Sequence, residues 1–457
     1  MKVHFISIGG SVMHQLAIAL KKKGYEVTGT DDEIFEPALS NLKEAGILPD
    51  TIGWNPDYIK PDLNAVILGM HARADNPELL KARELGLPIY SFPEYIYQES
   101  VQKKRIIVGG SHGKTTTTSM IMHVLKEQGM AFDYLVGAKL SGFEQSVQIT
   151  DAPVIVCEGD EYPASVLEKR PKFHFLFPHV AIITGIAWDH INVFPTFDFY
   201  LEQFVIFIQK IAPGGILIYN ETDSVLTELV AKNKRTDIQY QPYRIPQHEI
   251  TGGTTTLDIN GVKGVLSVFG NHNLLNAMAA YYACMQLGIS TEKFLKSIGS
   301  FTGAAKRLEL LAKSRVANVY RDFAHAPSKV KATVEAVKQQ FPERKLIAIL
   351  ELHTYSSLNV NFMKEYMGAL DGVDEAVVFY AKHALEIKKM PDLPADKVKE
   401  GFGNDALIVM NDKSELLNWL RKINTANANI LFMSSGNYDG LNINSLAEEI
   451  IATETSS

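Results

Sequence analysis

The sequence predicts an α/β protein with several domains, and three observations support this. Apolar strands near residues 2–8 and 106–108 each run into a glycine turn and then a helical pattern. A chain of 457 residues is too long for one hydrophobic core. In the last third, strands alternate with helices, which predicts a second parallel sheet. We expect a Rossmann-like domain over 1–98, a central phosphate-loop α/β domain over 99–300 and a second Rossmann-like domain over 301–457.

The composition is typical of a soluble globular protein, with 46% hydrophobic and 21% charged residues. The net charge of −7 argues against a nucleic-acid scaffold. No signal-peptide layout is present, and the longest apolar stretch, 173–188, is too short and too interrupted to span a membrane. Cys157 and Cys284 lie in apolar stretches, which suits reduced thiols. We therefore expect a cytoplasmic monomer or weak homodimer with neither nucleic-acid nor membrane partners.

The N-terminal region has the pattern of a β–α–β nucleotide-binding unit. A predicted strand over residues 2–8 is followed by the turn 9–11, a helix and a second strand. The dinucleotide fingerprint is incomplete, because its first glycine position is Ser7 and its last is Val12. A plain α/β turn is therefore an alternative to a nucleotide site. The candidate ligand-binding residues are Gly9, Gly10 and Ser11 in the turn, Asp31 after the second strand and His71 after a third.

A second glycine turn, residues 109–116, has the sequence of a phosphate-binding loop between a strand and a helix. Lys114 is placed to reach the β- and γ-phosphates of ATP, and the Thr115 hydroxyl is placed to hold Mg²⁺. The loop is a variant, because Val108 occupies the position of the first glycine. An ordinary glycine-rich turn with a solvated lysine is the alternative. The candidate ATP contacts in this loop are Gly110, Ser111, His112, Gly113, Lys114, Thr115 and Thr116.

Acidic residues follow the next strand, 154–157, beginning with Glu158. Carboxylates at the carboxyl end of a parallel strand beside a phosphate loop are natural Mg²⁺ ligands. A further strand, 180–184, leads to His190, which is a candidate site residue beside the phosphate loop. The alternatives are a solvated acidic turn and a structural histidine.

The segment 270–276 opens an apolar helix and is rich in asparagine. Asn273 and Asn276 share one helical face, and an asparagine amide pairs well with an adenine edge. Capping of the helix by the first asparagines is an alternative that does not exclude this role.

The third region combines fixed positive charge with polar residues at a strand end. Arg307 lies at the expected domain junction, and Asp322 and His325 lie between a strand and a helix that starts near Ser328. The following strands are expected at residues 346–350, 376–379, 407–410 and 430–433.

These motifs together resemble, in order and over nearly the whole chain, the Mur ligases of peptidoglycan synthesis. The likeness rests on Gly110-Ser-His-Gly-Lys-Thr-Thr-Thr-Thr, Glu158-Gly-Asp-Glu, Asp189-His190, Gly270-Asn-His-Asn-Leu-Leu-Asn, Lys306-Arg-Leu-Glu and Asp322-Phe-Ala-His.

The resemblance implies an ATP-dependent ligase that uses Mg²⁺. It places UDP-N-acetylmuramate in the first domain, ATP in the second and an amino acid or muramyl peptide in the third. The implied residues are Lys114, Glu158, His190 and Arg307 for catalysis; Thr115, Glu158 and His190 for metal; His272, Asn273, Asn276, Arg307, Asp322 and His325, with the phosphate loop, for ATP; Gly9, Gly10, Ser11, Asp31 and His71 for the UDP-sugar; and His353 and Tyr355 for the amine.

Local features are more similar to the murein peptide ligases of this family, which take L-alanyl-γ-D-glutamyl-meso-diaminopimelate, than to the UDP-N-acetylmuramate–L-alanine ligases. These features are Val12, 142–144, 168–173 and 433–436. The segment 351–355, however, matches neither subgroup well. His353 stands where murein peptide ligases carry an arginine, and Arg321 and Ala326 also depart from the family pattern. L-Alanine is therefore the alternative acceptor.

The mechanism that the resemblance implies starts with phosphorylation of the lactyl carboxylate by ATP. An amine then attacks the acyl phosphate, and phosphate leaves. Two other classes compete with this interpretation. A nicotinamide dehydrogenase accounts for the first glycine turn but not for Lys114. A phosphate-loop ATPase acting as a switch or motor accounts for the central domain alone, and it would hydrolyse ATP without a UDP-sugar.

Overall fold

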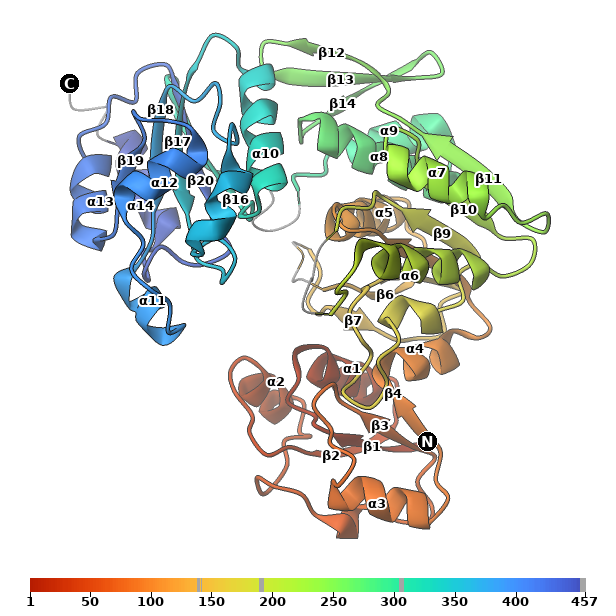
Figure 1. Ribbon diagram of the computed structural model, residues 1–457. Coiled ribbons are helices and arrows are strands. Elements are labelled where there is room, and N and C mark those ends of the chain that lie inside the picture. The colour runs from red at the N-terminus through yellow and green to blue at the C-terminus, as the bar shows by residue number, and fades with distance from the viewer. Residues whose placement is uncertain (138–139, 141, 189–192, 304–307, 453–457) are drawn as a thin grey trace. The chain divides into compact units, whose positions relative to one another are not determined.

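The computed structural model describes residues 1–137, 140, 142–188, 193–303 and 308–452. It divides into two compact units (Figure 1). Unit 1 comprises Met1–Ile245 and Leu275–Ile298, and unit 2 comprises Pro246–Leu274 and Gly299–Ser457. Each unit contains a mainly parallel sheet with helices, as the sequence predicts.

Unit 1 begins with a four-stranded parallel sheet in the order β2-β1-β3-β4. Its central strands are buried almost throughout, because helices supply apolar side chains to the sheet. The strands are β1 (Lys2–Ile6), β2 (Glu26–Thr30), β3 (Ala65–Leu68) and β4 (Ile89–Ser91); the helices are α1 (Ser11–Lys22), α2 (Ala38–Glu44), η1 (Pro56–Tyr58), α3 (Pro77–Glu84) and α4 (Phe92–Ser100).

A seven-stranded sheet forms the rest of unit 1, in the order β11-β10-β9-β5-β8-β6-β7, and only β7 is antiparallel to its neighbour. Its strands are β5 (Lys104–Gly109), β6 (Asp133–Leu135), β7 (Val147–Gln148), β8 (Val154–Glu158), β9 (Val180–Ile183), β10 (Ile216–Asn220) and β11 (Gln239–Tyr243). The helices of this part are α5 (Lys114–Glu127), η2 (Lys172–Phe175), α6 (Phe197–Gln209), α7 (Ser224–Lys232) and α9 (Thr291–Ile298).

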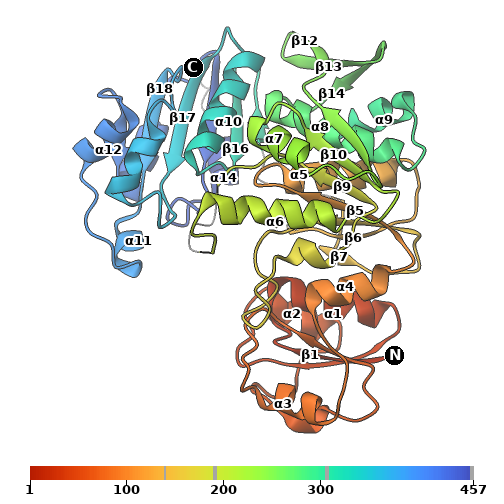
Figure 2. The ribbon, with the colours of Figure 1, turned by 45° about the vertical axis from the view of Figure 1, so that its right-hand side comes forward.

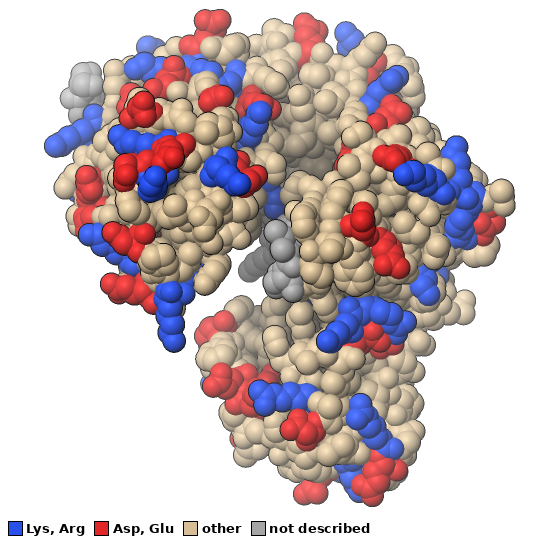
Figure 3. All heavy atoms as spheres, viewed as in Figure 1, with Lys and Arg blue, Asp and Glu red and all other residues tan. Residues whose placement is uncertain are grey.

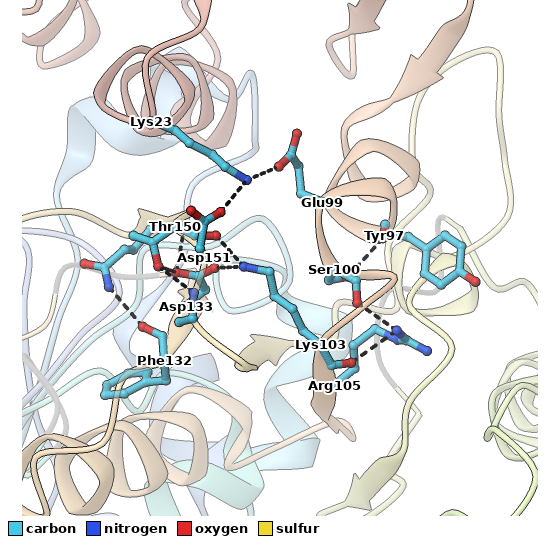
Figure 4. Close-up of polar contacts among 12 residues, drawn as sticks. Lys23, Tyr97, Glu99, Ser100, Lys103, Arg105, Phe132, Asp133, Thr150 and Asp151 are labelled. Atoms are coloured by element: carbon cyan, nitrogen blue, oxygen red, sulfur yellow. Dashed lines mark hydrogen bonds and ion pairs between the residues drawn. The ribbon is translucent and has the colours of Figure 1, made fainter. Parts of the chain in front are cut away.

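Polar contacts connect the parts of unit 1 that contain its two sheets (Figure 4). The Arg105 guanidinium donates to the carbonyl of Ser100 at 2.8 Å, at the end of α4. Lys23, directly after α1, lies 2.9 Å from a Glu99 carboxylate oxygen of α4 and 3.8 Å from an Asp151 carboxylate oxygen, which precedes β8. Within the second sheet, the Lys103 ammonium pairs with the buried Asp133 carboxylate of β6. Because apolar residues of both sheets also share one core, we regard unit 1 as a continuous body.

Unit 2 holds a six-stranded sheet in the order β15-β16-β20-β17-β18-β19, parallel except for β15. The strands are β15 (Glu309–Lys313), β16 (Ala317–Asp322), β17 (Lys345–Glu351), β18 (Glu375–Phe379), β19 (Ile408–Met410) and β20 (Ala428–Met433). The helices are α10 (Pro327–Gln340), η3 (Val360–Tyr366), α11 (Lys382–Ile387), α12 (Ala395–Phe402), α13 (Lys413–Leu420) and α14 (Ile443–Ala452).

A small antiparallel sheet in unit 2, which the sequence analysis did not predict, lies beside α10 in Figures 1 and 2. The Thr255 hydroxyl donates to the Gln340 side chain at 3.0 Å, which fixes the sheet to the end of that helix. Helix α8 (Asn271–Met285) follows the sheet. The strands are β12 (Gln247–Thr251), β13 (Thr254–Ile259) and β14 (Val262–Leu266).

Two further features of the structure concern the length of its apolar helices and the distribution of charge on its surface. No helix in the described part of the chain is both long and apolar enough to cross a bilayer. On the face that Figure 3 shows, basic and acidic side chains are interspersed over both units.

Candidate functional site

The phosphate loop joins β5 to α5, and two of its glycines are required by its backbone. Gly110 has a φ of +125° and Gly113 a φ of +79°, conformations that side chains disfavour. Space is also short, because a Cβ at Gly110 would lie 2.2 Å from the Thr184 hydroxyl. A Cβ at Gly113 would lie 2.4 Å from the Asn276 side-chain oxygen. The end of β9 and helix α8 therefore both pack directly on the loop.

Ser111 and His112 connect the phosphate loop to the segment that follows β9 and to helix α6. The Ser111 hydroxyl lies 2.8 Å from the Tyr200 hydroxyl and accepts the Ala187 N–H at 2.9 Å. The Thr184 hydroxyl donates to the His112 carbonyl. Ser111 is buried, so its side chain supports the loop from behind.

Lys114, the first residue of α5, points back over the loop. Its ammonium donates to the Gly110 carbonyl at 2.7 Å and to a Glu161 carboxylate oxygen at 2.6 Å. Burial opposes the charge on Lys114, but the carboxylates of Glu161, Asp160 and Glu158 outweigh it and raise the pKa of the ammonium. The lysine is therefore held charged beside the glycine loop.

Thr115 and Glu158 meet at the same place. The Thr115 hydroxyl donates to a Glu158 carboxylate oxygen at 2.9 Å, and the other oxygen accepts the Gly137 N–H at 3.0 Å. The described residues contain no cluster of three or more His, Cys, Asp or Glu side chains that could hold a metal. A hydroxyl and one carboxylate nevertheless fit Mg²⁺, which is commonly bound by one or two protein oxygens with phosphates and water. Thr116 is buried beneath the loop.

The acidic turn also carries Asp160, which has a different partner. Its carboxylate pairs with the Lys172 ammonium at 2.6 Å. Burial opposes the charge on Asp160, but Lys172, with Lys114 beyond it, lowers the pKa of the carboxyl. The turn therefore supplies three carboxylates with distinct contacts.

The asparagine-rich start of α8 contributes to both units. In unit 1, the Asn276 side-chain oxygen accepts the Thr117 hydroxyl at 3.2 Å and lies against Gly113. In unit 2, the buried Asn273 amide donates to the Phe269 carbonyl at 2.9 Å. Burial lowers the pKa of His272 to about 4, so this imidazole is neutral near pH 7.

In the N-terminal turn, Asp31 bonds to the glycine loop that precedes α1. Its carboxylate accepts the Gly9 N–H at 2.7 Å. Burial raises the pKa of Asp31 to about 6. Ser7, which replaces the first fingerprint glycine, has a φ of +67°, so a serine here adopts the conformation that glycine usually supplies. Gly10 is the N-cap of α1, Ser11 is the first residue of that helix, and His71 is exposed.

In unit 2, the candidate residues lie at the carboxyl ends of β16 and β17. The Asp322 carboxylate accepts the N–H groups of Leu308 at 2.6 Å and Ala324 at 2.7 Å. His325 lies 2.8 Å from the Phe323 carbonyl through Nδ1.

His353 and Tyr355 follow β17 at the same edge of the sheet. The Tyr355 side chain is exposed, and the His353 Nδ1 lies 4.0 Å from a Glu351 carboxylate oxygen. Two further predicted residues, His190 and Arg307, lie outside the described residues.

Three family models match the chain in sequence. They are the "Mur ligase family, catalytic domain" over residues 2–103, the "Mur ligase middle domain" over 108–284 and the "Mur ligase, glutamate ligase domain" over 306–436. A UDP-N-acetylmuramate–L-alanine ligase from Sulfurihydrogenibium sp. is 30% identical over 444 residues, 95% of each chain. The chain belongs to the Mur ligase family.

Both UDP-N-acetylmuramate–L-alanine ligases and murein peptide ligases match this Mur ligase over almost its whole length. The UDP-N-acetylmuramate–L-alanyl-γ-D-glutamyl-meso-2,6-diaminoheptandioate ligase of Haemophilus influenzae is 27% identical over 96% of this chain and 97% of that one. Among solved structures, the UDP-N-acetylmuramate–alanine ligase MurC of Thermotoga maritima has a TM-score of 0.67 at 23% identity, covering 100% and 99% of the two chains. The murein peptide ligase Mpl of Psychrobacter arcticus has a TM-score of 0.62 at 22% identity, with 99% of each chain covered.

These matches confirm the three-domain α/β architecture and the enzyme class. This Mur ligase is an ATP-dependent, ADP-forming ligase of peptidoglycan synthesis. The domain boundaries and the roles of individual residues stay predictions.

Sequence reasoning missed the side chains that support the site. Glu161 was grouped with the acidic turn, but its ion pair with Lys114 depends on how β8 and α5 pack. Tyr200 and Thr184, which hold the loop, carry no sequence signal. Glu351 was visible as a carboxylate at the end of a buried strand, a pattern that marked Glu158 and so offered a clue.

Proposed function

We propose that this Mur ligase joins the lactyl carboxylate of UDP-N-acetylmuramate to the amine of L-alanyl-γ-D-glutamyl-meso-diaminopimelate. The observation that carries the ATP-driven part is the convergence of Lys114, Thr115 and Glu158 on one glycine loop. We further propose that the enzyme acts in the cytoplasm as a monomer or weak homodimer.

The chemistry requires activation of a carboxylate, which is a poor electrophile. A lactyl carboxylate oxygen attacks the γ-phosphorus of ATP, the bond to the β-phosphate oxygen breaks, and ADP leaves. The neutral amine then attacks the acyl carbon, and phosphate departs with the carboxylate oxygen. The amine gives up a proton as the amide forms.

Positive charge is needed because the first step brings two anions together. Lys114 lies beside the loop and is held charged, so we assign it to the β- and γ-phosphates. Thr115 and Glu158 would hold Mg²⁺, which would screen phosphate charge when bound. We assign further screening charge to His190 and Arg307.

The remaining assignments follow the order of the domains. Residues 1–98 bind the UDP group, with Gly9, Gly10 and Ser11 facing phosphates, and with Asp31 and His71 at the sheet edge. His272, Asn273 and Asn276 serve the nucleotide, as do Asp322 and His325. Residues 301–457 take the acceptor at His353 and Tyr355.

The peptide acceptor carries several carboxylates, so its site must offer more cations or donors than a site for L-alanine. At the carboxyl edge of the unit 2 sheet, the His383 imidazole lies 3.2 Å from an Asp439 carboxylate oxygen, and the Lys413 ammonium donates to the Asp439 carbonyl at 3.0 Å. The Lys413 ammonium and the His383 and His353 imidazoles can donate hydrogen bonds to carboxylates, and they support the larger acceptor. The likeness of Val12, 142–144, 168–173 and 433–436 to murein peptide ligases adds to this support.

A second candidate is ligation of L-alanine by the same chemistry. Sequence similarity favours it, because relatives at 30–31% identity are UDP-N-acetylmuramate–L-alanine ligases.

Phosphate release decides between these acceptors. The enzyme is given ATP, Mg²⁺ and UDP-N-acetylmuramate with equal, sub-saturating amounts of the tripeptide, L-alanine, L-serine or glycine, singly and in competition. We expect the highest kcat/KM for the tripeptide. If the kcat/KM for L-alanine matches or exceeds it, the second candidate replaces the first.

A further inference from the structure

A buried carboxylate with no assigned role ends strand β17, next to the proposed acceptor residues. Glu351 is 2% exposed. One of its oxygens accepts the Ser434 hydroxyl and also the Tyr438 N–H, the latter at 2.9 Å. Strand β20 lies beside β17, so Glu351 connects the segments that follow both strands.

The second segment, residues 434–438, is organised around this carboxylate. The Ser434 hydroxyl donates to Glu351 and accepts the Gly436 N–H at 2.7 Å. The Ser434 N–H donates to the Asp322 carbonyl at 3.0 Å, so the segment is also fixed to the end of β16. Three neighbouring strand ends are thus linked, and Glu351 accepts from the segment at both of its ends.

The backbone of this segment adopts an unfavourable conformation. Tyr438, its last residue, has a φ of +50°, and Asp439, which follows the segment, has a φ of +58°. Side chains other than glycine rarely adopt such values, and these conformations persist only where the surrounding structure imposes them. The Tyr438 ring is buried, and its hydroxyl lies 2.8 Å from the Ile349 carbonyl. The Tyr438 N–H donates to Glu351, so this carboxylate also supports the left-handed turn.

His353 lies against the same segment at Gly436. A Cβ added at Gly436 would lie 2.7 Å from the His353 Cγ, 2.8 Å from its Nδ1 and 2.8 Å from a Glu351 carboxylate oxygen. The backbone of Gly436 is not left-handed, so the constraint on this residue is the close approach of the imidazole rather than its own φ. The position of the His353 ring therefore depends on the position of residues 434–438, which Glu351 holds through its hydrogen bonds to Ser434 and Tyr438.

We propose that Glu351 is a positioning residue for the acceptor: it holds residues 434–438 in the left-handed turn, and this sets the His353 imidazole at the edge that receives the amine substrate. The inference rests on the proposed function for its choice of substrate. Glu351 itself is buried behind the edge and does not touch the acceptor.

The charge of Glu351 is part of this role. Two donors converge on one of its oxygens, and hydrogen bonds to an ionised acceptor are about twice as strong as neutral ones. A glutamine keeps an oxygen for Ser434 and Tyr438, but it loses the charge and places an NH₂ group toward His353. We therefore expect a graded series, in which Glu351→Gln is milder than Glu351→Ala.

The test measures KM for each of the three substrates separately. We expect Glu351→Gln and Gly436→Ala each to raise KM for the acceptor by about tenfold or more, and to leave KM for ATP and for UDP-N-acetylmuramate within about twofold. The alanine methyl group would overlap both the His353 imidazole and the Glu351 carboxylate without removing charge, so it tests the same placement by steric means.

Ser435→Ala is the matched control. This residue belongs to the same segment, but among the described residues its hydroxyl has no hydrogen-bond partner. Its loss should leave every KM unchanged. A uniform change in all three KM values, or an unchanged acceptor KM in both test variants while they remain folded, would overturn the proposal.

A spectroscopic readout separates this inference from the proposed function. The NMR signal of the His353 imidazole, assigned with His353→Gln, should shift in Glu351→Gln and Gly436→Ala but not in Ser435→Ala. If the parent enzyme ligates L-alanine instead of the tripeptide, the KM test is run with L-alanine. If it ligates neither, the proposed function fails, and an unmoved His353 signal would overturn the positioning role on its own.

Discussion

At the scale of single residues, the acidic turn after β8 is notable because each carboxylate has its own partner. Glu158 accepts from Thr115, Asp160 pairs with Lys172, and Glu161 pairs with Lys114. The charge of Lys114 is therefore already balanced by Glu161, which is buried. A triphosphate can attract the lysine only by competing with this ion pair or by using the remaining N–H of the ammonium.

Replacement of Lys114 by alanine should abolish ligation without unfolding the protein. Loss of one γ-phosphate contact removes a few kcal/mol of transition-state stabilisation, so we expect a drop in kcat of roughly a hundredfold or more at saturating ATP. Lys126→Ala is the control, because Lys126 is exposed near the other end of α5. Near-normal turnover of the Lys114 variant would remove this lysine from the mechanism.

Replacement of Glu158 by glutamine tests the proposed metal site. The amide keeps the size of the side chain but loses the charge that a hard cation prefers. We expect a higher Mg²⁺ concentration for half-maximal turnover, with little change in the binding of UDP-N-acetylmuramate. Titration of Mg²⁺ and calorimetric binding of the UDP-sugar measure the two effects. An unaltered Mg²⁺ requirement at equal turnover would mean that Glu158 is structural.

At the scale of elements, the strand–turn–helix of the phosphate loop depends on packing as well as on conformation. Gly110 and Gly129 both have positive φ values, +125° and +64°. Only at Gly110 would a Cβ meet other atoms, since nothing lies within 4 Å at Gly129. Substitutions at these two glycines therefore distinguish two costs: both variants carry backbone strain, but only the Gly110 variant adds steric overlap.

Substitution of either glycine by alanine should lower thermal stability, because a left-handed alanine costs about 1–3 kcal/mol. We expect Gly110→Ala also to lose ATP binding, since its methyl group displaces Thr184 and with it the loop. Gly129→Ala should bind ATP normally. Melting temperatures and nucleotide titrations of both variants test this, and equal ATP affinity in the two would contradict the packing argument.

A buried histidine in the short helix η2 makes the stability of the fold depend on pH. Burial lowers the pKa of His174 to about 4, and the hydrogen bond to the Gln203 carbonyl opposes this only partly. The unfolded chain, with a histidine pKa near 6.5, then binds the proton more readily. Stability from this residue is therefore complete above pH ~6.5 and is lost as the pH falls toward 4, by up to about 3 kcal/mol.

A glutamine at position 174 can donate to the same carbonyl without titrating. We expect the melting temperature of His174→Gln to fall less than that of the parent between pH 7 and pH 4.5. His248→Gln, on the exposed strand β12, is the control. An identical pH dependence in the His174 variant and the parent would show that this histidine titrates alike in both states.

The sequence predicted those elements whose signals are local. The strands around residues 106 and 430 and the helix after Lys114 follow from apolar runs and glycine punctuation, and all are present. The sheet β12–β14 was missed, because two of its strands lack a buried apolar run: β12 is exposed throughout, and only one residue of β14 is buried. Partners such as Glu161 for Lys114 and Glu351 for Ser434 join segments far apart in sequence, so local patterns could not reveal them.

At the scale of the whole molecule, a ligase of this family must couple ATP cleavage to amide formation. An acyl phosphate is destroyed by water, so the enzyme must withhold it from solvent until the amine attacks. A phosphate-loop switch or motor has no such requirement, because water is its acceptor. The fate of the carboxylate oxygen distinguishes these two kinds of chemistry.

The last prediction follows that oxygen through one turnover. UDP-N-acetylmuramate labelled with ¹⁸O in its lactyl carboxylate should transfer one labelled oxygen to each phosphate released. The reason is that the carboxylate oxygen forms the bond to phosphorus and the acyl carbon–oxygen bond breaks when the amine attacks. Mass spectrometry of the phosphate measures the label. Without UDP-N-acetylmuramate, phosphate release should be negligible. Unlabelled phosphate formed in step with amide, or rapid release without the UDP-sugar, would exclude the acyl-phosphate route.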